Sequence, residues 1–182
     1  MFYETRYEEL LRDLLNEPVL PIPELGTNPF QSAKKHIEQK FFPSSERYVS
    51  PSLTGRVTFD YSNNNGMYAI GQGALLFELE FSKASDYSIH LYNDAASIDT
   101  IALVKDKTQI KDIEDARVYD GSSRVRTIKL QQIAVVMNKN GFFAAIKLLG
   151  LKDDSRNDTI DEITFEYVIQ SNGTPVFIEA GY

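Results

Sequence analysis

Beyond Arg56 the sequence alternates apolar and polar residues with a period of two, a pattern that restricts this part of the chain to β structure. Successive side chains of a strand point to opposite faces, so each such segment has one apolar and one polar face. The alternation is clearest in residues 74–82 and 160–170. The pattern predicts ten strands, at residues 56–61, 66–71, 74–82, 87–93, 100–105, 115–119, 126–137, 142–151, 160–170 and 174–179.

Turn signals separate several of these strands. Asn-Gly pairs occur at Asn65-Gly66, Asn140-Gly141 and Asn172-Gly173, each between β-rich segments. Asparagine and glycine tolerate the positive φ angles of a tight turn, so the three pairs predict antiparallel hairpins. In residues 126–137 the apolar positions change parity near Gln131-Gln132. A β-bulge explains this change, and so does a strand that bends from one sheet into another.

Many one-sided strands joined by hairpins favour two packed sheets. We therefore predict a mainly β fold, an antiparallel two-sheet β-sandwich of jelly-roll type with two short N-terminal helices. A closed β-barrel with N-terminal helices is the alternative.

The first fifty residues have a different pattern. Apolar side chains at three- and four-residue steps in residues 3–17 indicate an amphipathic helix. A proline-rich connector occupies residues 18–29, and a second short helix is predicted from Asn28 to Pro43. The sequence thus predicts a helical N-terminal segment with its connector at residues 1–50 and a β-sandwich domain at residues 51–182.

Composition excludes several kinds of chemistry. The chain has no cysteine, which rules out thiol catalysis, disulfides and thiolate metal sites. Its 26 acidic and 19 basic side chains give a formal charge of −7, which argues against general nucleic-acid binding. The N-terminus lacks the apolar core of a signal peptide, and no stretch approaches the roughly 20 apolar residues of a membrane helix. These features predict a cytoplasmic protein that does not bind membranes.

Polar and aromatic side chains on one predicted sheet face form the first candidate site. Its expected ligand-binding residues are Glu78, Glu80, His90, Tyr92 and Asp94. Such a face suits a small ligand or a carbohydrate, whereas a solvated sheet face is the alternative reading. A metal or catalytic centre at His90 requires the chain to turn before Asp94, because four residues of a strand span roughly 13 Å.

Residues 152–162 concentrate five carboxylates between two predicted strands. Calcium takes about six to eight oxygen ligands, and oxygen-rich loops at sandwich edges can supply them. The candidate metal ligands are Asp153, Asp154, Asp158 and Asp161. Calcium is the one cofactor that the sequence suggests. A solvated loop, partly neutralised by Lys152 and Arg156, is the alternative.

Residues 121–129 contain the one local concentration of basic side chains. Arg124 and Arg126 are predicted to share a face there and to bind an anion or a phosphate. Edge-strand charges that discourage aggregation are the alternative. A nuclease-like metal motif built on Glu80 and Lys83 fails, because the lysine comes one residue late and faces the other side of the strand.

No set of residues in the sequence has the spacing that a catalytic site of these kinds requires. We therefore predict a non-catalytic binding or assembly module that acts through protein–protein contacts. The expected contact surface is residues 1–43, because the first predicted helix carries more apolar and aromatic surface than a free helix exposes. A small-ligand or carbohydrate-binding β-sandwich, assisted by calcium, is the first alternative. A metal-dependent hydrolase centred on His90 is the second.

Overall fold

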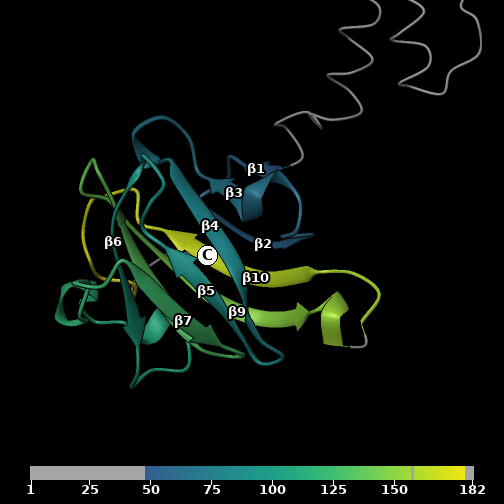
Figure 1. Cartoon of the computed structure of the whole chain (residues 1–182). Coiled ribbons are helices and arrows are strands. Elements are labelled where there is room, and N and C mark those ends of the chain that lie inside the picture. Colours follow the sequence, from purple (N-terminus) through teal and green to yellow (C-terminus); the bar gives the residue numbers. More distant parts are fainter. Residues whose placement is uncertain (1–47, 157, 179–182) are drawn as a thin grey trace, which may run out of the picture. The chain divides into compact units, whose positions relative to one another are not determined.

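The computed structural model describes residues 48–156 and 158–178, and these fold into two five-stranded sheets (Figure 1). Sheet A has the strand order β1-β3-β4-β5-β7, and sheet B has the order β2-β10-β9-β8-β6. Every strand pair is antiparallel except β1 with β3. The strands are β1 Val49–Ser50, β2 Thr54–Phe59, β3 Met67–Ile70, β4 Phe77–Ser85, β5 Ser88–Tyr92, β6 Ile98–Val104, β7 Val125–Lys129, β8 Ile133–Asn138, β9 Phe143–Lys152 and β10 Glu162–Ile169.

Short 3-10 turns are the helical elements of the described residues. They are η2 Asn64–Gly66, η3 Gly73–Leu75, η4 Ile110–Asp112, η5 Ala116–Val118 and η6 Asp154–Arg156. No helix in this part of the chain is long and apolar enough to cross a membrane. The two predicted N-terminal helices, their connector and the contact surface at residues 1–43 lie outside the described residues. The domain boundary at residue 50 stays a prediction.

The inner faces of the two sheets share one core. Phe81 of sheet A lies with its ring centroid 5.6 Å from that of Phe165 and 6.1 Å from that of Phe59, both in sheet B. These aromatic side chains bury large apolar areas, and tilted ring pairs add a further attraction. The period-two alternation therefore predicts the inward-facing residues of β4 and β10 correctly.

The predicted strand 126–137 is two strands in different sheets. β7 ends at Lys129 in sheet A and β8 begins at Ile133 in sheet B. Between them Gln131 has a φ of 66° and donates its backbone N–H to Leu148 O at 2.8 Å. The change of apolar parity thus marks the passage of the chain from one sheet to the other, which confirms that interpretation over a simple bulge.

Two predicted strands are wrong. Residues 115–119 form the turn η5, because the Asp115 carboxylate accepts the backbone N–H of Arg117 and caps it. Residues 174–178 form no strand and instead bond to the segment that contains η5. Backbone N–H groups of Ala116 and Phe177 donate to Pro175 O and Ile113 O, at 2.8 and 2.9 Å.

The three Asn-Gly pairs have three different outcomes. Asn140-Gly141 joins the antiparallel strands β8 and β9, so the hairpin prediction is confirmed there. Asn65-Gly66 carries the chain from β2 in sheet B to β3 in sheet A, and the hairpin prediction is wrong. Asn172-Gly173 forms a turn after β10, but no partner strand follows it within the described residues.

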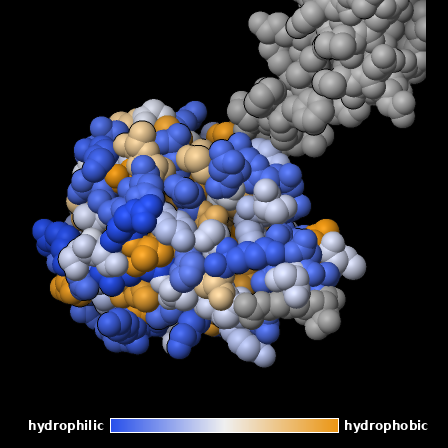
Figure 2. Space-filling model, viewed as in Figure 1, coloured by the Kyte–Doolittle hydropathy of each residue, from blue (hydrophilic) through white to orange (hydrophobic). Residues whose placement is uncertain are grey.

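A mainly β, two-sheet fold is confirmed, and the alternative of a closed barrel is wrong because each sheet has two different edge strands. The jelly-roll topology stays a prediction. Hydrophilic residues cover most of the surface drawn in Figure 2, where the hydrophobic ones form small, separate groups. The large apolar side chains that remain exposed include Tyr87 at 69% and Val118 at 73%.

Candidate ligand-binding face

The outer face of sheet A brings together most of the polar residues that the sequence singled out. Glu80 of β4 lies opposite Tyr92 of β5, and Ser82 lies opposite His90. All four are half-buried, whereas the residues that alternate with them, such as Phe81, point into the core. The rigid pairing of β4 with β5 therefore fixes the spacing of these side chains.

Neighbouring side chains hold the two aromatic rings of this face. His90 Nδ1 lies 2.9 Å from Thr127 Oγ1 on β7, and the Tyr92 hydroxyl lies 3.0 Å from Ser82 Oγ. The rings of His90 and Tyr92 meet edge to face, with centroids 6.2 Å apart. Their orientation is thus set before any ligand arrives.

An ion pair closes one end of the face. Arg124 Nε donates to Asp94 Oδ1 at 2.7 Å, and the Arg124 guanidinium carbon lies 5.6 Å from the Tyr92 ring centroid. The hydrogen bonds from Arg124 lower the pKa of Asp94 below its ordinary value. Asp94 therefore stays ionised at neutral pH, and Tyr92 lies beside a balanced pair of charges rather than a free cation.

Glu78, the fifth predicted residue, lies two positions before Glu80 on the same strand. Its carboxylate accepts the backbone N–H of Ser97 at 3.3 Å, and its own backbone N–H donates to Ser97 Oγ at 2.8 Å. Glu78 thus anchors the loop that leads to β6. We name the remaining set the polar face, and it consists of Glu80, Ser82, His90, Tyr92, Asp94, Arg124 and Thr127.

The two arginines predicted to bind an anion have separate partners. Arg126 lies opposite the buried Leu91 and turns to the end of the sheet, where its Nε donates to Ile101 O at 3.3 Å. Its guanidinium also pairs with the Asp120 carboxylate at 2.9 Å. Hydrogen bonds from Ser122, and then from Arg126, lower the pKa of Asp120. Arg124 and Arg126 therefore do not converge on a common anion.

Sequence reasoning missed the lysine at the centre of the acidic residues. Lys83 Nζ lies 2.6 Å from Asp154 Oδ1, 2.9 Å from Asp161 Oδ1 and 3.0 Å from Asp153 Oδ1. These three carboxylates lie close enough together to hold a metal ion, but the Lys83 ammonium already lies among them. Asp158, the fourth predicted ligand, accepts the backbone N–H of Asp153 at 2.9 Å.

Burial and hydrogen bonding determine the ionisation of these acidic residues. Hydrogen bonds from Ser155 and Lys83 lower the pKa of Asp153 to about 2, despite its burial. Burial opposes the ionisation of Asp161, but the hydrogen bonds from Lys83 and from the Asp154 N–H outweigh it and lower its pKa. The same contacts, led by that with Asp154, raise the pKa of Lys83. The cluster is thus a set of ion pairs at neutral pH.

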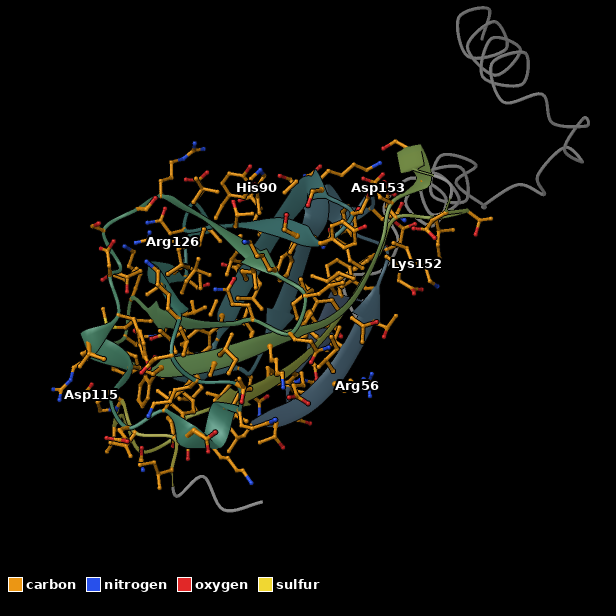
Figure 3. The ribbon with its side chains drawn as sticks, turned by 90° about the horizontal axis from the view of Figure 1, so that it is seen from below. Arg56, His90, Asp115, Arg126, Lys152 and Asp153 are labelled. Atoms are coloured by element: carbon orange, nitrogen blue, oxygen red, sulfur yellow. The ribbon has the colours of Figure 1, made fainter. Side chains whose placement is uncertain are left out.

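The acidic cluster and the polar face are separate sites. In Figure 3 Asp153 lies beside the turn η6, away from His90. His90 does not belong to the group of carboxylates that could hold a metal among the described residues. Its Nδ1 contacts a hydroxyl group of Thr127 rather than a carboxylate, so this contact does not supply the acid–histidine pair of a hydrolase.

The chain matches no protein-family model, no curated protein and no solved structure with which it was compared. The fold and the polar face define the chain as a mainly β protein of two sheets with a polar, half-exposed outer surface on sheet A.

Proposed function

We propose that this chain is a non-catalytic binding domain whose polar face contacts a small hydroxylated ligand of the carbohydrate type. The observation that supports this most is the side-by-side placement of Glu80, His90 and Tyr92 on adjacent strands. All three are half-buried, so each presents polar atoms to solvent from a fixed backbone position. A preorganised set of this kind loses little conformational entropy when a ligand binds.

The chemistry of the polar face suits hydroxyl groups. A carboxylate accepts hydrogen bonds, and imidazole and phenol groups both donate and accept them. Sugar hydroxyls also do both. Among the described residues, none of the large apolar side chains that are exposed belongs to β4 or β5. The polar face therefore lacks the apolar centre of a protein interface, which supports a polar small ligand over a protein partner at this surface.

The other predicted functions have less support. Assembly through residues 1–43 is a separate proposal, tested by deleting them and measuring the molar mass by light scattering. A hydrolase at His90 lacks the carboxylate contact described above, and calcium assistance at the acidic residues would have to displace Lys83. The cytoplasmic location is likewise a prediction.

Amide chemical shifts of the labelled protein, measured during titration with neutral and acidic mono- and oligosaccharides, test the proposal. We expect a binding sugar to shift the amides of β4 and β5, and the variants Glu80→Gln and Tyr92→Ala to weaken binding several-fold. Glu166→Gln is the matched control, because Glu166 is a half-buried carboxylate of β10 in the other sheet. Shifts confined to other surfaces, or equal effects of all three variants, would refute the proposal.

A further inference from the structure

A second hydrophobic cluster covers the outer face of sheet B. The segment between β6 and β7 crosses this face, and the segment after β10 runs beside it, joined by the backbone hydrogen bonds described above. The buried side chains of the cluster are Ala102, Val104, Ile110, Ile113, Ala116, Ile133, Val135, Phe143, Ala145, Val168 and Phe177. We call residues 105–121 the cover segment.

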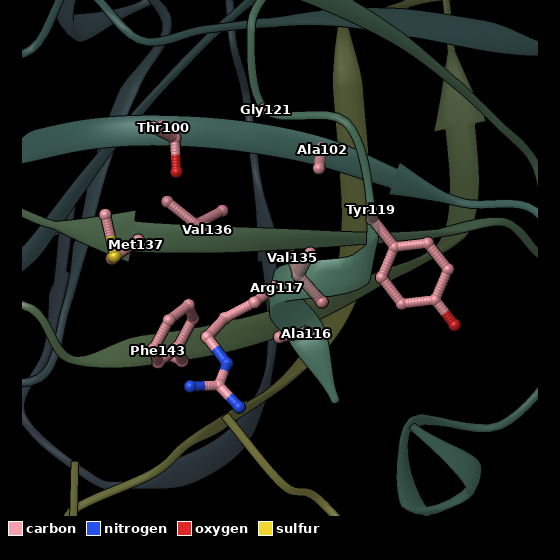
Figure 4. Close-up of a pocket in the computed structure, with 10 residues that line it drawn as sticks. All are labelled: Thr100, Ala102, Ala116, Arg117, Tyr119, Gly121, Val135, Val136, Met137 and Phe143. Atoms are coloured by element: carbon pink, nitrogen blue, oxygen red, sulfur yellow. The ribbon is translucent and has the colours of Figure 1, made fainter. Parts of the chain in front are cut away.

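The cover segment leaves a cavity of about 230 Å³ against the sheet (Figure 4). β6, β8 and β9 form its floor, and Ala116, Arg117, Tyr119 and Gly121 of the cover segment form its wall. Two of the lining residues, Ala102 and Ala116, have small side chains. The cavity lies on sheet B, apart from the polar face of sheet A.

One contact within the cover segment and one with the segment after β10 hold the wall of the cavity in place. The Tyr119 hydroxyl donates to Asp106 Oδ1 at 2.8 Å, and burial followed by this contact raises the pKa of Tyr119 to about 12. The Tyr119 ring therefore remains a neutral, fixed part of the lining. Because the backbone at Ala116 also bonds to Pro175, the opening does not depend on a freely moving loop.

The size of the cavity limits the ligand. A cavity of about 150 Å³ holds one benzene molecule, so one of this size accommodates roughly ten non-hydrogen atoms. Most of the lining is apolar, from Val135, Met137 and Phe143. The body of a ligand must therefore be apolar as well, a single ring or a short aliphatic chain.

Arg117 supplies the polar contact at the edge of this cavity. Its side chain is 67% exposed, and it pairs with Asp115 through Nε at 2.9 Å and Nη2 at 2.7 Å. These bonds leave the donors of Nη1 for a ligand oxygen. The hydrogen bonds from Arg117 lower the pKa of Asp115 to about 2, so that carboxylate is charged at neutral pH. The pair of Arg117 and Asp115 has no net charge, so Arg117 contacts a ligand through the hydrogen bonds of Nη1 and not through the attraction of a free cation.

We infer that this cavity binds a small monocarboxylic acid, with the ring or chain between the cover segment and sheet B and the carboxylate on Arg117. The Nη1 donors of Arg117 select an oxygen acceptor, of which a carboxylate is the strongest, and the volume and the apolar lining select the body of the ligand. This inference does not depend on the function proposed for the polar face.

Benzoate, cyclohexanecarboxylate and benzyl alcohol are the probes for this inference, titrated into the labelled full-length chain. We expect both carboxylates to shift the amides of Ala116, Arg117 and Met137, and to show nuclear Overhauser contacts with the Phe143 ring. Benzyl alcohol should bind about tenfold more weakly, because it lacks the charged hydrogen-bond acceptor.

Two variants separate the parts of the inference. Arg117→Gln should weaken benzoate binding about tenfold and leave benzyl alcohol unchanged, and its exposed position keeps the fold intact. Ala102→Leu fills the cavity and should abolish binding of all probes. Arg56→Gln, an exposed arginine on β2, is the control and should bind as the unmodified chain does. No shifts at the cavity with any probe, or equal binding by Arg117→Gln, would overturn the inference.

Discussion

Lys83 Nζ lies 2.9 Å from Asp161 Oδ1, and this ion pair joins the two sheets. Lys83 belongs to β4 of sheet A, whereas Asp161 immediately precedes β10 of sheet B. Lys83 lies opposite Ile89 and follows Leu79 and Phe81 in the inward-facing series of β4. The core ends before this position, so the inward-facing lysine meets the β9–β10 connection and its carboxylates instead of another apolar side chain.

Replacing this lysine should destabilise the protein strongly. Lys83→Met keeps the length and apolar stem of the side chain but removes the ammonium group that pairs with the buried carboxylates of Asp153 and Asp161. We expect the melting temperature to fall by several degrees. Lys139→Met is the control, because the exposed pair of Lys139 with Asp99 at 2.7 Å should contribute less than about 1 kcal/mol. Equal effects of the two variants would contradict the assigned role of Lys83.

The same variant makes a prediction about calcium. In the unmodified chain we expect no calcium-dependent change in melting temperature, because the Lys83 ammonium already lies among the three carboxylates. Lys83→Met removes this ammonium, and calcium should then restore part of the lost stability. Melting temperatures of the unmodified chain and of Lys83→Met, each measured with calcium and with a chelator, test both expectations. A calcium-dependent stabilisation of the unmodified chain would show that the ion displaces Lys83.

The acidic residues also predict how stability depends on pH. The pKa of Asp153 is about 2 in the folded chain and 3.8 in the unfolded chain, so its ionised form favours folding. Its contribution is complete above about pH 4 and is lost as the pH falls through about 2. Urea unfolding across this range should show a steep loss of stability, and Asp153→Asn should make that loss shallower. An unchanged slope in the variant would contradict this prediction.

Several features of the fold follow from the sequence because they depend on neighbouring residues. Phe81 and Phe165 alternate with polar residues, and both are buried as that alternation predicts. The segment at residues 115–119 was wrongly predicted as a strand. Its composition favours a strand, but the Asp115 side chain caps a turn there instead. The Asn-Gly signal at Gly66 identifies a turn but does not determine which sheet the next strand enters.

The candidate sites are harder to predict because they arise from contacts between distant residues. Alternation places Glu80, His90 and Tyr92 on polar faces, yet only the register of β4 with β5 shows that they are neighbours. The pairing of Lys83 with Asp154 joins residues 71 positions apart. The sequence does contain a signal for this pairing, because Lys83 is a cation at the end of the inward-facing residues of its strand. The cavity near Arg117 has no such signal, because it exists only once the cover segment has folded onto sheet B.

Two glycines with similar backbone angles should respond differently to alanine. Gly66 has a φ of +71° and Gly141 a φ of +81°, so both substitutions force a left-handed conformation that costs about 1–2 kcal/mol. A Cβ atom at Gly66 would also lie 2.0 Å from the carbonyl oxygen of Phe81, whereas one at Gly141 meets nothing within 4 Å. We expect Gly66→Ala to lower the free energy of unfolding clearly more than Gly141→Ala. Equal costs in urea unfolding would show that the chain relaxes around Gly66.

The alternation of inward- and outward-facing residues along β10 allows a direct test of the core between the two sheets. Phe165 is 1% exposed and contacts aromatic rings of both sheets, whereas its neighbour Thr164 lies on the outer side, with its hydroxyl 2.9 Å from that of Thr58. Phe165→Ala should lower the free energy of unfolding by about 3–5 kcal/mol, because it leaves a cavity between the sheets. Thr164→Ala should cost less than about 1 kcal/mol, since it removes one exposed hydrogen bond. The opposite ranking in urea unfolding would mean that β10 presents its other face to the core, which would also invalidate the placement of the inward-facing residues of sheet B.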